Sequence, residues 1–160
     1  TSPEEQQNVK QLYKSVYPEP HKMPSSPYKD VPLPALAQAL QVLPATVLAL
    51  QRHIQPGELE TLSSLLGRPV HDVSSLNEDL EGMLALLSLL NEYVGVSNTN
   101  MHLLAGLGKT ARVLIPSPPE WRWQATGEES PWFKGFKVYR QTVEKDWSVA
   151  LQRLRGDLQA

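Results

Sequence analysis

Four small polar residues stand in a row in this 160-residue chain: Ser97, Asn98, Thr99 and Asn100. They follow an apolar segment at 93–96 that is typical of a strand and lead into a segment at 100–107 that is typical of a helix. A helix N-terminus has unpaired N–H groups and a partial positive charge, so such side chains beside it can hold the oxygens of a diphosphate. The same residue types are the preferred N-caps, and capping needs only one of them. The segment therefore predicts an anion-binding site, with capping alone as the alternative.

Two further residues belong to the same predicted helix. His102 lies one turn after Asn98, so both side chains project from the same end of the helix and His102 is a candidate ligand contact. Ordinary packing is the alternative for His102. Gly106 is small enough to let the helix approach either the sheet or a ligand closely. The other histidines have no metal-ligand spacing with His102, so no metal site is predicted.

Gln51 and Arg52 end a second apolar segment, residues 46–50. Parallel strands end at one edge of a sheet, and ligands of open α/β sheets bind at that edge. Arg52 could clamp a phosphate there. Pairing with Glu58 or Glu60 is the alternative.

Three of the four tryptophans fall in one loop region, at positions 121, 123 and 132. Aromatic rings with a nearby arginine can stack on a nucleobase or a sugar. The favoured interpretation is that this loop folds over and pins a helix to the sheet. The sequence contains no nucleophile elbow, phosphate loop or dinucleotide fingerprint, so it predicts no self-contained catalytic centre.

Helices and short strands alternate along most of the chain. Helices are predicted at 34–43, 56–66, 78–90, 100–107 and 147–154, and strands at 46–50, 70–73, 93–96, 112–115 and 136–139. Asn77 and Asp146 are the expected N-caps of the third and last helices. The alternation predicts an α/β fold: a doubly wound, Rossmann-like parallel sheet of about five strands with helices on both faces.

The first part of the chain differs from the rest. Residues 4–16 have helical spacing of apolar residues, and four prolines follow between positions 18 and 27. We therefore divide the chain into an N-terminal helix with a proline-rich linker at 1–27 and an α/β domain at 28–160.

Composition excludes several classes of protein. Hydrophobic residues make up 41%, the net charge is −2 and cysteine is absent. The balance is that of a globular protein without disulfides or thiolate sites, and it opposes a nucleic-acid partner. The longest apolar run is too short to cross a membrane. We expect a cytoplasmic protein without a transmembrane segment.

Several short motifs occur together in the order found in one enzyme family. Residues 102–108 read His-Leu-Leu-Ala-Gly-Leu-Gly, similar to the family's His-Leu-Ala-Gly-Ala-Leu-Gly. Residues 120–123, 130–133, 139–141 and 146–147 resemble its Asp-Trp-Arg-Trp, Ser-Pro-Trp-Tyr, Phe-Arg-Gln and Asp-Trp. From about residue 28 to residue 158, the chain thus resembles the C-terminal half of bacterial GT-B glycosyltransferases of the ADP-heptose:lipopolysaccharide heptosyltransferase type, in particular those attached to tetratricopeptide repeats.

The resemblance implies a nucleotide-sugar donor domain. It implies that Ser97, Asn98, Thr99 and His102 line the donor diphosphate pocket, with Asn100 and Gly106 beside them and Gln51 and Arg52 on the rim. It also implies further domains in cis, one of which carries the base and binds a protein or glycan acceptor. The nucleotide sugar is then a substrate, and no cofactor is expected. A non-catalytic protein-interaction module derived from such a domain is the alternative.

The sequence departs from the family in two places. The family usually has Asp-Thr where this chain has Ser97 and Asn98, so an acidic group is missing from the predicted pocket. The family domain also opens with an apolar strand and a glycine-bearing loop, and residues 17–27 contain no such strand. The missing acid would alter donor choice or abolish transfer. The missing strand means either that this sequence omits residues or that the domain is trimmed, and the loop after it would normally touch the donor phosphates.

Overall fold

The computed structural model describes residues 30–160, of which residues 31–160 form one compact unit. The N-terminal helix and linker predicted at 1–27 lie outside the described residues. The helices of the described part are α2 (Leu33–Leu40), α3 (Glu58–Leu66), α4 (Leu80–Leu89), α5 (Thr99–Gly106) and α6 (Ser148–Gln159). The strands are β1 (Val47–Ala49), β2 (Val70–Asp72), β3 (Val94–Val96), β4 (Arg112–Ile115) and β5 (Lys137–Arg140), and two 3₁₀ helices are η2 (Ser74–Glu78) and η3 (Trp121–Trp123).

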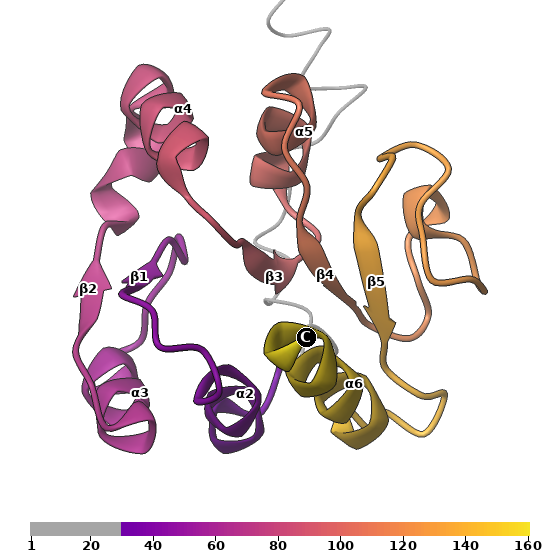
Figure 1. Cartoon of the computed structure of the whole chain (residues 1–160), viewed down its shortest axis with the longest axis horizontal. Helices are drawn as coiled ribbons and strands as arrows, with labels where there is room; N and C mark the ends of the chain where they lie inside the picture. The colour runs from indigo at the N-terminus through magenta and orange to yellow at the C-terminus, as the bar shows by residue number, and fades with distance from the viewer. Residues whose placement is uncertain (1–29) are drawn as a thin grey trace, which may run out of the picture. The chain divides into compact units, whose positions relative to one another are not determined.

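The strands form two parallel sheets. β1 pairs with β2, and β3, β4 and β5 pair in that order, with every pair parallel. The predicted α/β class with parallel strands is therefore confirmed. A single five-stranded sheet is not formed, because β1 and β3 do not pair with each other in the described part of the chain. In Figure 1, β1 and β3 are the strands of the two sheets that are nearest to each other, and their ribbons are clearly separated.

Helices lie on both faces of the three-stranded sheet (Figure 1). Side chains of β4 alternate between the faces, as a parallel strand requires. Val113 and Ile115 belong to a core cluster with Met83 and Leu87 of α4. Leu114 belongs to a second cluster formed largely by α2 and α6. A strand covered on both faces reads as a continuous apolar run, and this explains the sequence of β4.

Two predicted helix caps are revised by the structure. α4 begins at Leu80, because the Asp79 carboxylate accepts a hydrogen bond from the Gly82 N–H at 3.0 Å. Asn77, predicted as this cap, lies in η2 and donates its amide to the Leu50 carbonyl at 3.1 Å. α6 begins at Ser148, so Trp147 and not the predicted Asp146 is at the N-cap position. The Asp146 carboxylate still accepts a hydrogen bond from the Ser148 N–H at 2.9 Å. α6 runs on to Gln159 rather than ending at 154.

No helix among residues 30–160 is both long enough and apolar enough to span a bilayer.

Candidate functional site

Ser97, Asn98 and Thr99 connect β3 to α5, and we call them the β3–α5 corner. Asn98 is the N-cap of α5, and its side-chain oxygen accepts a hydrogen bond from the Asn100 N–H at 2.9 Å. The Met101 N–H donates to the Asn98 carbonyl at 3.2 Å. Capping therefore occupies two of the amides that the sequence offered to an anion, while the Asn98 and Thr99 side chains stay at the surface.

Asn100 points inward rather than toward a ligand. It is 7% exposed, and its side-chain amide donates to the Tyr93 hydroxyl at 3.2 Å. The Asn98 amide donates to the same hydroxyl, also at 3.2 Å. Burial raises the pKa of Tyr93, so this phenol remains a neutral hydrogen-bonding group. The Tyr93–Asn98–Asn100 network holds the start of α5 against β3.

A carboxylate lies at the corner, although residues 97 and 98 lack the acidic group of the family's Asp-Thr. The Ser97 hydroxyl donates to Glu120 Oε2 at 3.1 Å, and Arg122 forms an ion pair with the same oxygen at 3.0 Å. Glu120 comes from the loop after β4, the strand beside β3. Sequence reasoning missed Glu120 as a member of the site. The signal was its place after the next strand, because neighbouring parallel strands end at one edge of the sheet.

The ion pair of Glu120 and Arg122 lies between the corner and two exposed tryptophans, Trp121 and Trp132. The Arg122 guanidinium lies 5.2 Å from the centre of the Trp121 ring. Trp121 packs edge-on against Trp132, with ring centres 5.3 Å apart. These two rings are 66% and 63% exposed, which is far more than core packing would leave open. A flat apolar ring with a cation beside it suits the face of a base or a sugar, or a partner protein.

Trp123, unlike Trp121 and Trp132, is buried. It is 1% exposed and stacks on Phe133 with ring centres 5.1 Å apart. His102 meets the edge of the same phenylalanine at 5.1 Å while remaining at the surface. The predicted pinning role therefore applies to Trp123, and His102 lies beside this loop.

Arg140, at the end of β5, fixes the shape of the tryptophan loop. Its guanidinium donates to the carbonyl oxygens of Trp123, Gln124, Thr126 and Gly127, at distances from 2.5 to 3.0 Å. One arginine thus satisfies four main-chain acceptors that would otherwise lack strong donors. Sequence reasoning also missed this residue, since the carbonyl groups it binds leave no sequence signal.

Gln51 and Arg52 follow the end of β1, a strand of the other sheet. Gln51 donates to the Glu58 carboxylate at 3.0 Å, and Arg52 donates to the Asn77 carbonyl at 3.4 Å. Within residues 30–160, no hydrogen bond or ion pair joins either residue to the β3–α5 corner. Gly106 is at the C-terminal end of α5, roughly 12 Å along the helix axis from Asn98.

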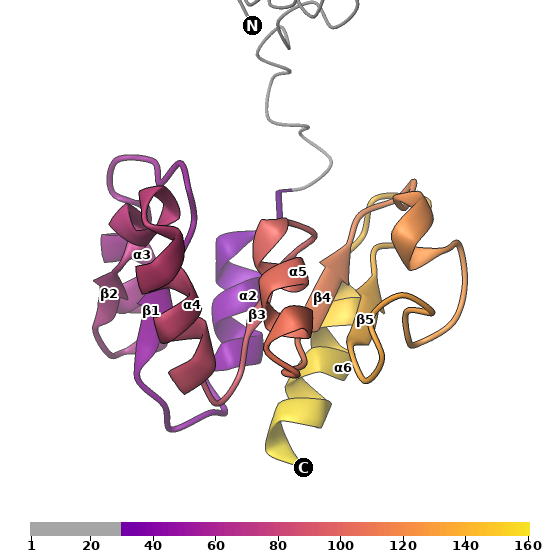
Figure 2. The same ribbon diagram turned by 90° about the horizontal axis from the view of Figure 1, so that it is seen from above.

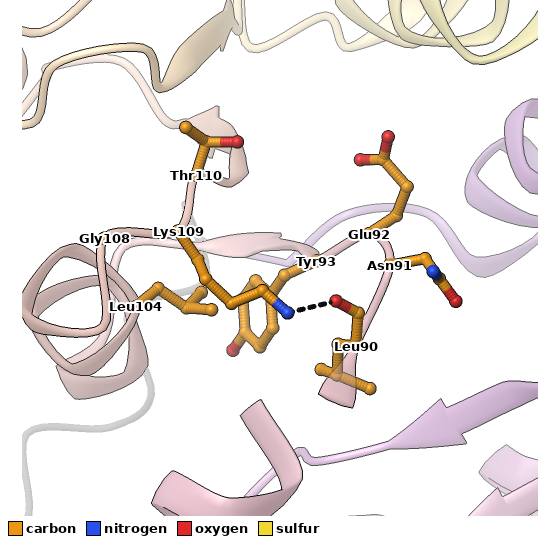
Figure 3. Close-up of a pocket in the computed structure, with 8 residues that line it drawn as sticks. All are labelled: Leu90, Asn91, Glu92, Tyr93, Leu104, Gly108, Lys109 and Thr110. Carbon is orange, nitrogen blue, oxygen red and sulfur yellow. Dashed lines mark hydrogen bonds between the residues drawn. The ribbon is translucent and has the colours of Figure 1, made fainter. Parts of the chain in front are cut away.

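The opposite edge of the three-stranded sheet carries a small hollow of about 220 Å³ (Figure 3). It lies against the start of β3, where Tyr93 and Lys109 line it. Lys109 Nζ donates to the carbonyls of Ser88 and Leu90, at 2.6 and 2.5 Å. These carbonyls end α4, so the lysine acts as a C-terminal cap and the hollow has a structural origin.

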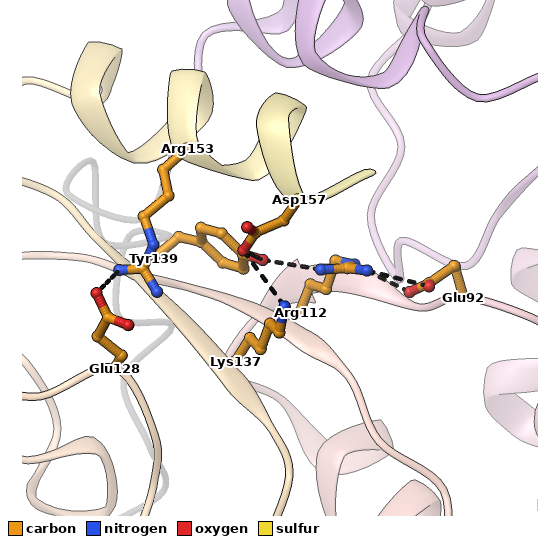
Figure 4. Close-up of polar contacts among 7 residues, drawn as sticks. All are labelled: Glu92, Arg112, Glu128, Lys137, Tyr139, Arg153 and Asp157. Atoms are coloured by element: carbon orange, nitrogen blue, oxygen red, sulfur yellow. Dashed lines mark hydrogen bonds and ion pairs between the residues drawn. The ribbon is translucent and has the colours of Figure 1, made fainter. Parts of the chain in front are cut away.

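A polar network also lies at that edge (Figure 4). Arg112 donates to the Tyr139 hydroxyl at 3.0 Å and pairs with Glu92 at 3.0 Å. Tyr139 in turn donates to Asp157 at 2.7 Å. Burial, together with the hydrogen bond to Asp157, raises the pKa of Tyr139 to about 12. The network ties α6 to the starts of β3 and β4.

The described residues contain no cluster of three or more histidine or acidic side chains placed to hold a metal ion. Comparison with family models, with curated proteins and with solved structures finds no match to this chain. The fold and the site therefore define an α/β protein with parallel sheets. Its candidate site, at the carboxyl ends of β3 and β4, combines a capped helix N-terminus, a Glu–Arg pair and two exposed tryptophans.

Proposed function

We propose that this chain contains the donor-binding domain of a GT-B-type glycosyltransferase, a doubly wound domain that binds a nucleotide sugar at the β3–α5 corner. One observation carries the proposal. The corner is joined through Glu120 and Arg122 to the exposed Trp121–Trp132 pair. A nucleotide sugar has an anionic diphosphate, hydroxyl groups and flat apolar faces, and this surface offers a partner for each.

Each group would contact a different part of the ligand. The N-terminus of α5 and the side chains of Asn98 and Thr99 would face the diphosphate. Trp121 and Trp132 would stack on the base or the sugar. Glu120 repels phosphate and accepts hydrogen bonds from hydroxyl groups, so it suits the sugar, while Arg122 offsets its charge. His102, which is exposed at the start of α5, would also contact the diphosphate.

Thermal unfolding with a panel of nucleotide diphosphates and nucleotide sugars tests the proposal. At millimolar ligand, the melting temperature of the chain should rise for at least one nucleotide sugar. Asn98→Ala and His102→Ala should remove the shift. The matched control is Gln152→Ala, an exposed residue of α6, which should keep it. A panel without any shift in the wild-type chain would count against the proposal.

Glu120→Gln separates the two parts of the ligand. Removing the negative charge should strengthen binding of the free nucleoside diphosphate, because the repulsion at the corner disappears. The same change should weaken the additional binding contributed by the sugar. Equal effects on the diphosphate and on the nucleotide sugar would place Glu120 outside the site.

Transfer itself would need the whole protein. From the resemblance we propose metal-independent, inverting transfer, in which the donor domain stabilises the leaving diphosphate. Another domain would supply the base and bind a protein or glycan acceptor. An assay of the full-length protein with the nucleotide sugar found in the panel would test this step.

A protein-interaction module is the second candidate function. The high exposure of Trp121 and Trp132 favours it, because exposed tryptophans are frequent anchors of protein interfaces. In this case a partner should be captured by the wild-type chain and lost from the double variant Trp121→Ser with Trp132→Ser. The chain would then show no thermal shift with any nucleotide.

A further inference from the structure

A second hollow lies where β1 and β2 begin. The two strands are parallel and lie side by side (Figures 1 and 2), so their amino ends meet at one edge of the two-stranded sheet. The hollow has a volume of about 340 Å³, within the range of about 300–1,000 Å³ that small-molecule sites occupy. It is lined by residues from the segments before the two strands and by one residue of β2: Pro44, Ala45, Thr46, Arg68, Pro69 and His71. It shares no residue with the β3–α5 corner.

Arg68 brings a positive charge to this hollow, and most of its hydrogen-bonding groups are unused. A guanidinium has five N–H donors. Within residues 30–160, one of them has an acceptor, because Arg68 Nη2 donates to the Leu40 carbonyl at 3.1 Å. The Nε–H is buried and has no acceptor in the same part of the chain. Buried polar groups nearly always have a partner, so this side chain has fewer acceptors than a guanidinium requires.

The surroundings of Arg68 offset only part of its charge. Leu40 is the last residue of α2, and a helix C-terminus carries about half a negative charge. No carboxylate of the described residues forms an ion pair with Arg68. The acidic residue of β2, Asp72, comes directly after His71, so its side chain lies on the other face of the strand, where it accepts from the Ser74 N–H at 2.9 Å. The hollow therefore keeps a net positive charge.

Thr46 and His71 add further donors to the same hollow. His71 is opposite Leu48 in the ladder, and Thr46 comes two residues before Leu48, so strand alternation places both side chains on one face of the sheet. Both residues are exposed, and neither side chain forms a hydrogen bond within residues 30–160. A hydroxyl and an imidazole can each donate to an anion. The hollow thus offers a guanidinium, an imidazole and a hydroxyl, without an acidic residue in its lining.

We propose that this hollow, which we call the Arg68 hollow, binds the phosphate group of a small phosphorylated molecule. Arg68 would donate to two of the phosphate oxygens, and His71 and Thr46 would donate to the remaining one. The rings of Pro44 and Pro69 would contact the carbon skeleton of the molecule. A carboxylate has only two oxygens, both in one plane, and would leave part of this donor set unused.

NMR spectroscopy of the whole 160-residue chain tests the proposal directly. At constant ionic strength, millimolar inorganic phosphate should shift the amide signals of Thr46 and His71 and the Nε–H signal of Arg68. Glucose 6-phosphate should bind at least as tightly, because the hollow has room for its carbon part. Acetate and glucose are the control ligands, and both should shift these signals much less.

Two matched pairs of variants locate the binding site. Arg68→Gln should weaken binding of both phosphates by about tenfold or more, because it removes a charged donor. Arg155→Gln, in an exposed arginine of α6, should leave binding unchanged. His71→Gln should weaken binding by about threefold, whereas His53→Gln should not. If Arg68→Gln fails to fold, the two histidine variants still decide the question.

Four results would overturn the proposal. The first is the absence of shifts at Thr46, Arg68 and His71 with millimolar inorganic phosphate, and the second is equal shifts with acetate. The third is binding of inorganic phosphate without binding of glucose 6-phosphate, which would show a site for the free ion only. The fourth is loss of phosphate binding in Asn98→Ala, which would place the anion at the β3–α5 corner. Because the Arg68 and His71 variants leave that corner intact, this proposal and the nucleotide-sugar proposal can fail independently.

Discussion

Two apolar segments of similar composition have very different surroundings. Val113, Leu114 and Ile115 of β4 are at most 2% exposed. All three residues of β1, Val47–Ala49, are only partly buried. β4 has a strand on each side, whereas β1 has one neighbour in the described structure. A single paired neighbour does not by itself leave a strand open, because Val138 and Tyr139 of the edge strand β5 are fully buried. The comparison teaches that burial depends on how completely the faces and edges of each strand are covered by the rest of the fold.

The largest expected effect tests this difference with the same substitution in each strand. Leu114→Ala should lower the free energy of unfolding by about 3 kcal/mol, since it removes a fully buried side chain from the α2–α6 face. Leu48→Ala should cost about 1 kcal/mol, because the site is already half open. Urea unfolding measures both values. Equal losses would show that β1 is as well covered in solution as β4.

The second prediction compares two arginines that bind main-chain carbonyls. Arg140→Ala in the three-stranded half should cost about 2 kcal/mol, because four carbonyls of the tryptophan loop lose a charged donor. Arg68→Ala in the two-stranded half removes one such bond, to the Leu40 carbonyl, and should cost less than about 1 kcal/mol. Tryptophan fluorescence should also change in Arg140→Ala alone. The reverse ranking would contradict the assigned role of Arg140.

A third prediction concerns the network of Arg112, Tyr139 and Asp157. Tyr139→Phe should cost about 1.5 kcal/mol at neutral pH, because Arg112 and Asp157 lose their shared hydroxyl. The folded protein favours the neutral phenol, since the pKa of Tyr139 rises from 10.0 to about 12. The corresponding stability is complete below pH 10 and is lost as the pH rises toward 12. Alkaline titration of the unfolding free energy should show this loss in the wild-type chain and a smaller one in Tyr139→Phe.

The smallest expected effect is the difference in stability loss between variants of two helix caps. Asn98→Ala should cost about 1 kcal/mol, because it removes the α5 cap together with a partner of Tyr93. Asp79→Ala removes the α4 cap alone and should cost about 0.5 kcal/mol. Thermal unfolding of both variants gives the difference. A larger loss in Asp79→Ala would mean that the Tyr93 network adds nothing to α5.

Much of the local structure follows from local patterns. The strand at 112–115 is predicted at its observed bounds, and the helix predicted at 100–107 differs by one residue at each end. The positive φ of Gly108, +69°, agrees with its predicted place just after a helix. Helix starts are less certain, because Asn77 and Asp79 are both good caps. Asp79 caps α4, while the Asn77 amide is occupied by the Leu50 carbonyl, a contact from a distant part of the chain.

The sequence predicted only the part of the candidate site that lies at the junction of β3 and α5. Ser97 and Asn98 were found because polar residues at a strand-to-helix junction form a local pattern. Glu120 and Arg140 were not found, because each meets its partners through the pairing of separate strands. His102 and the exposed tryptophans were noticed as residue types, but their place beside the corner depends on the folded loop.

The amino-acid sequence by itself determined the α/β class, the alternation of elements and the polar junction after β3. These properties depend on periodicity and capping, which act over a few residues. The tertiary structure alone decided that the five strands divide into two sheets, that a carboxylate stands at the corner, and that Trp123 is buried while Trp121 is exposed. The physical reason is that strand pairing and burial depend on neighbours far along the chain, and a local pattern does not specify them.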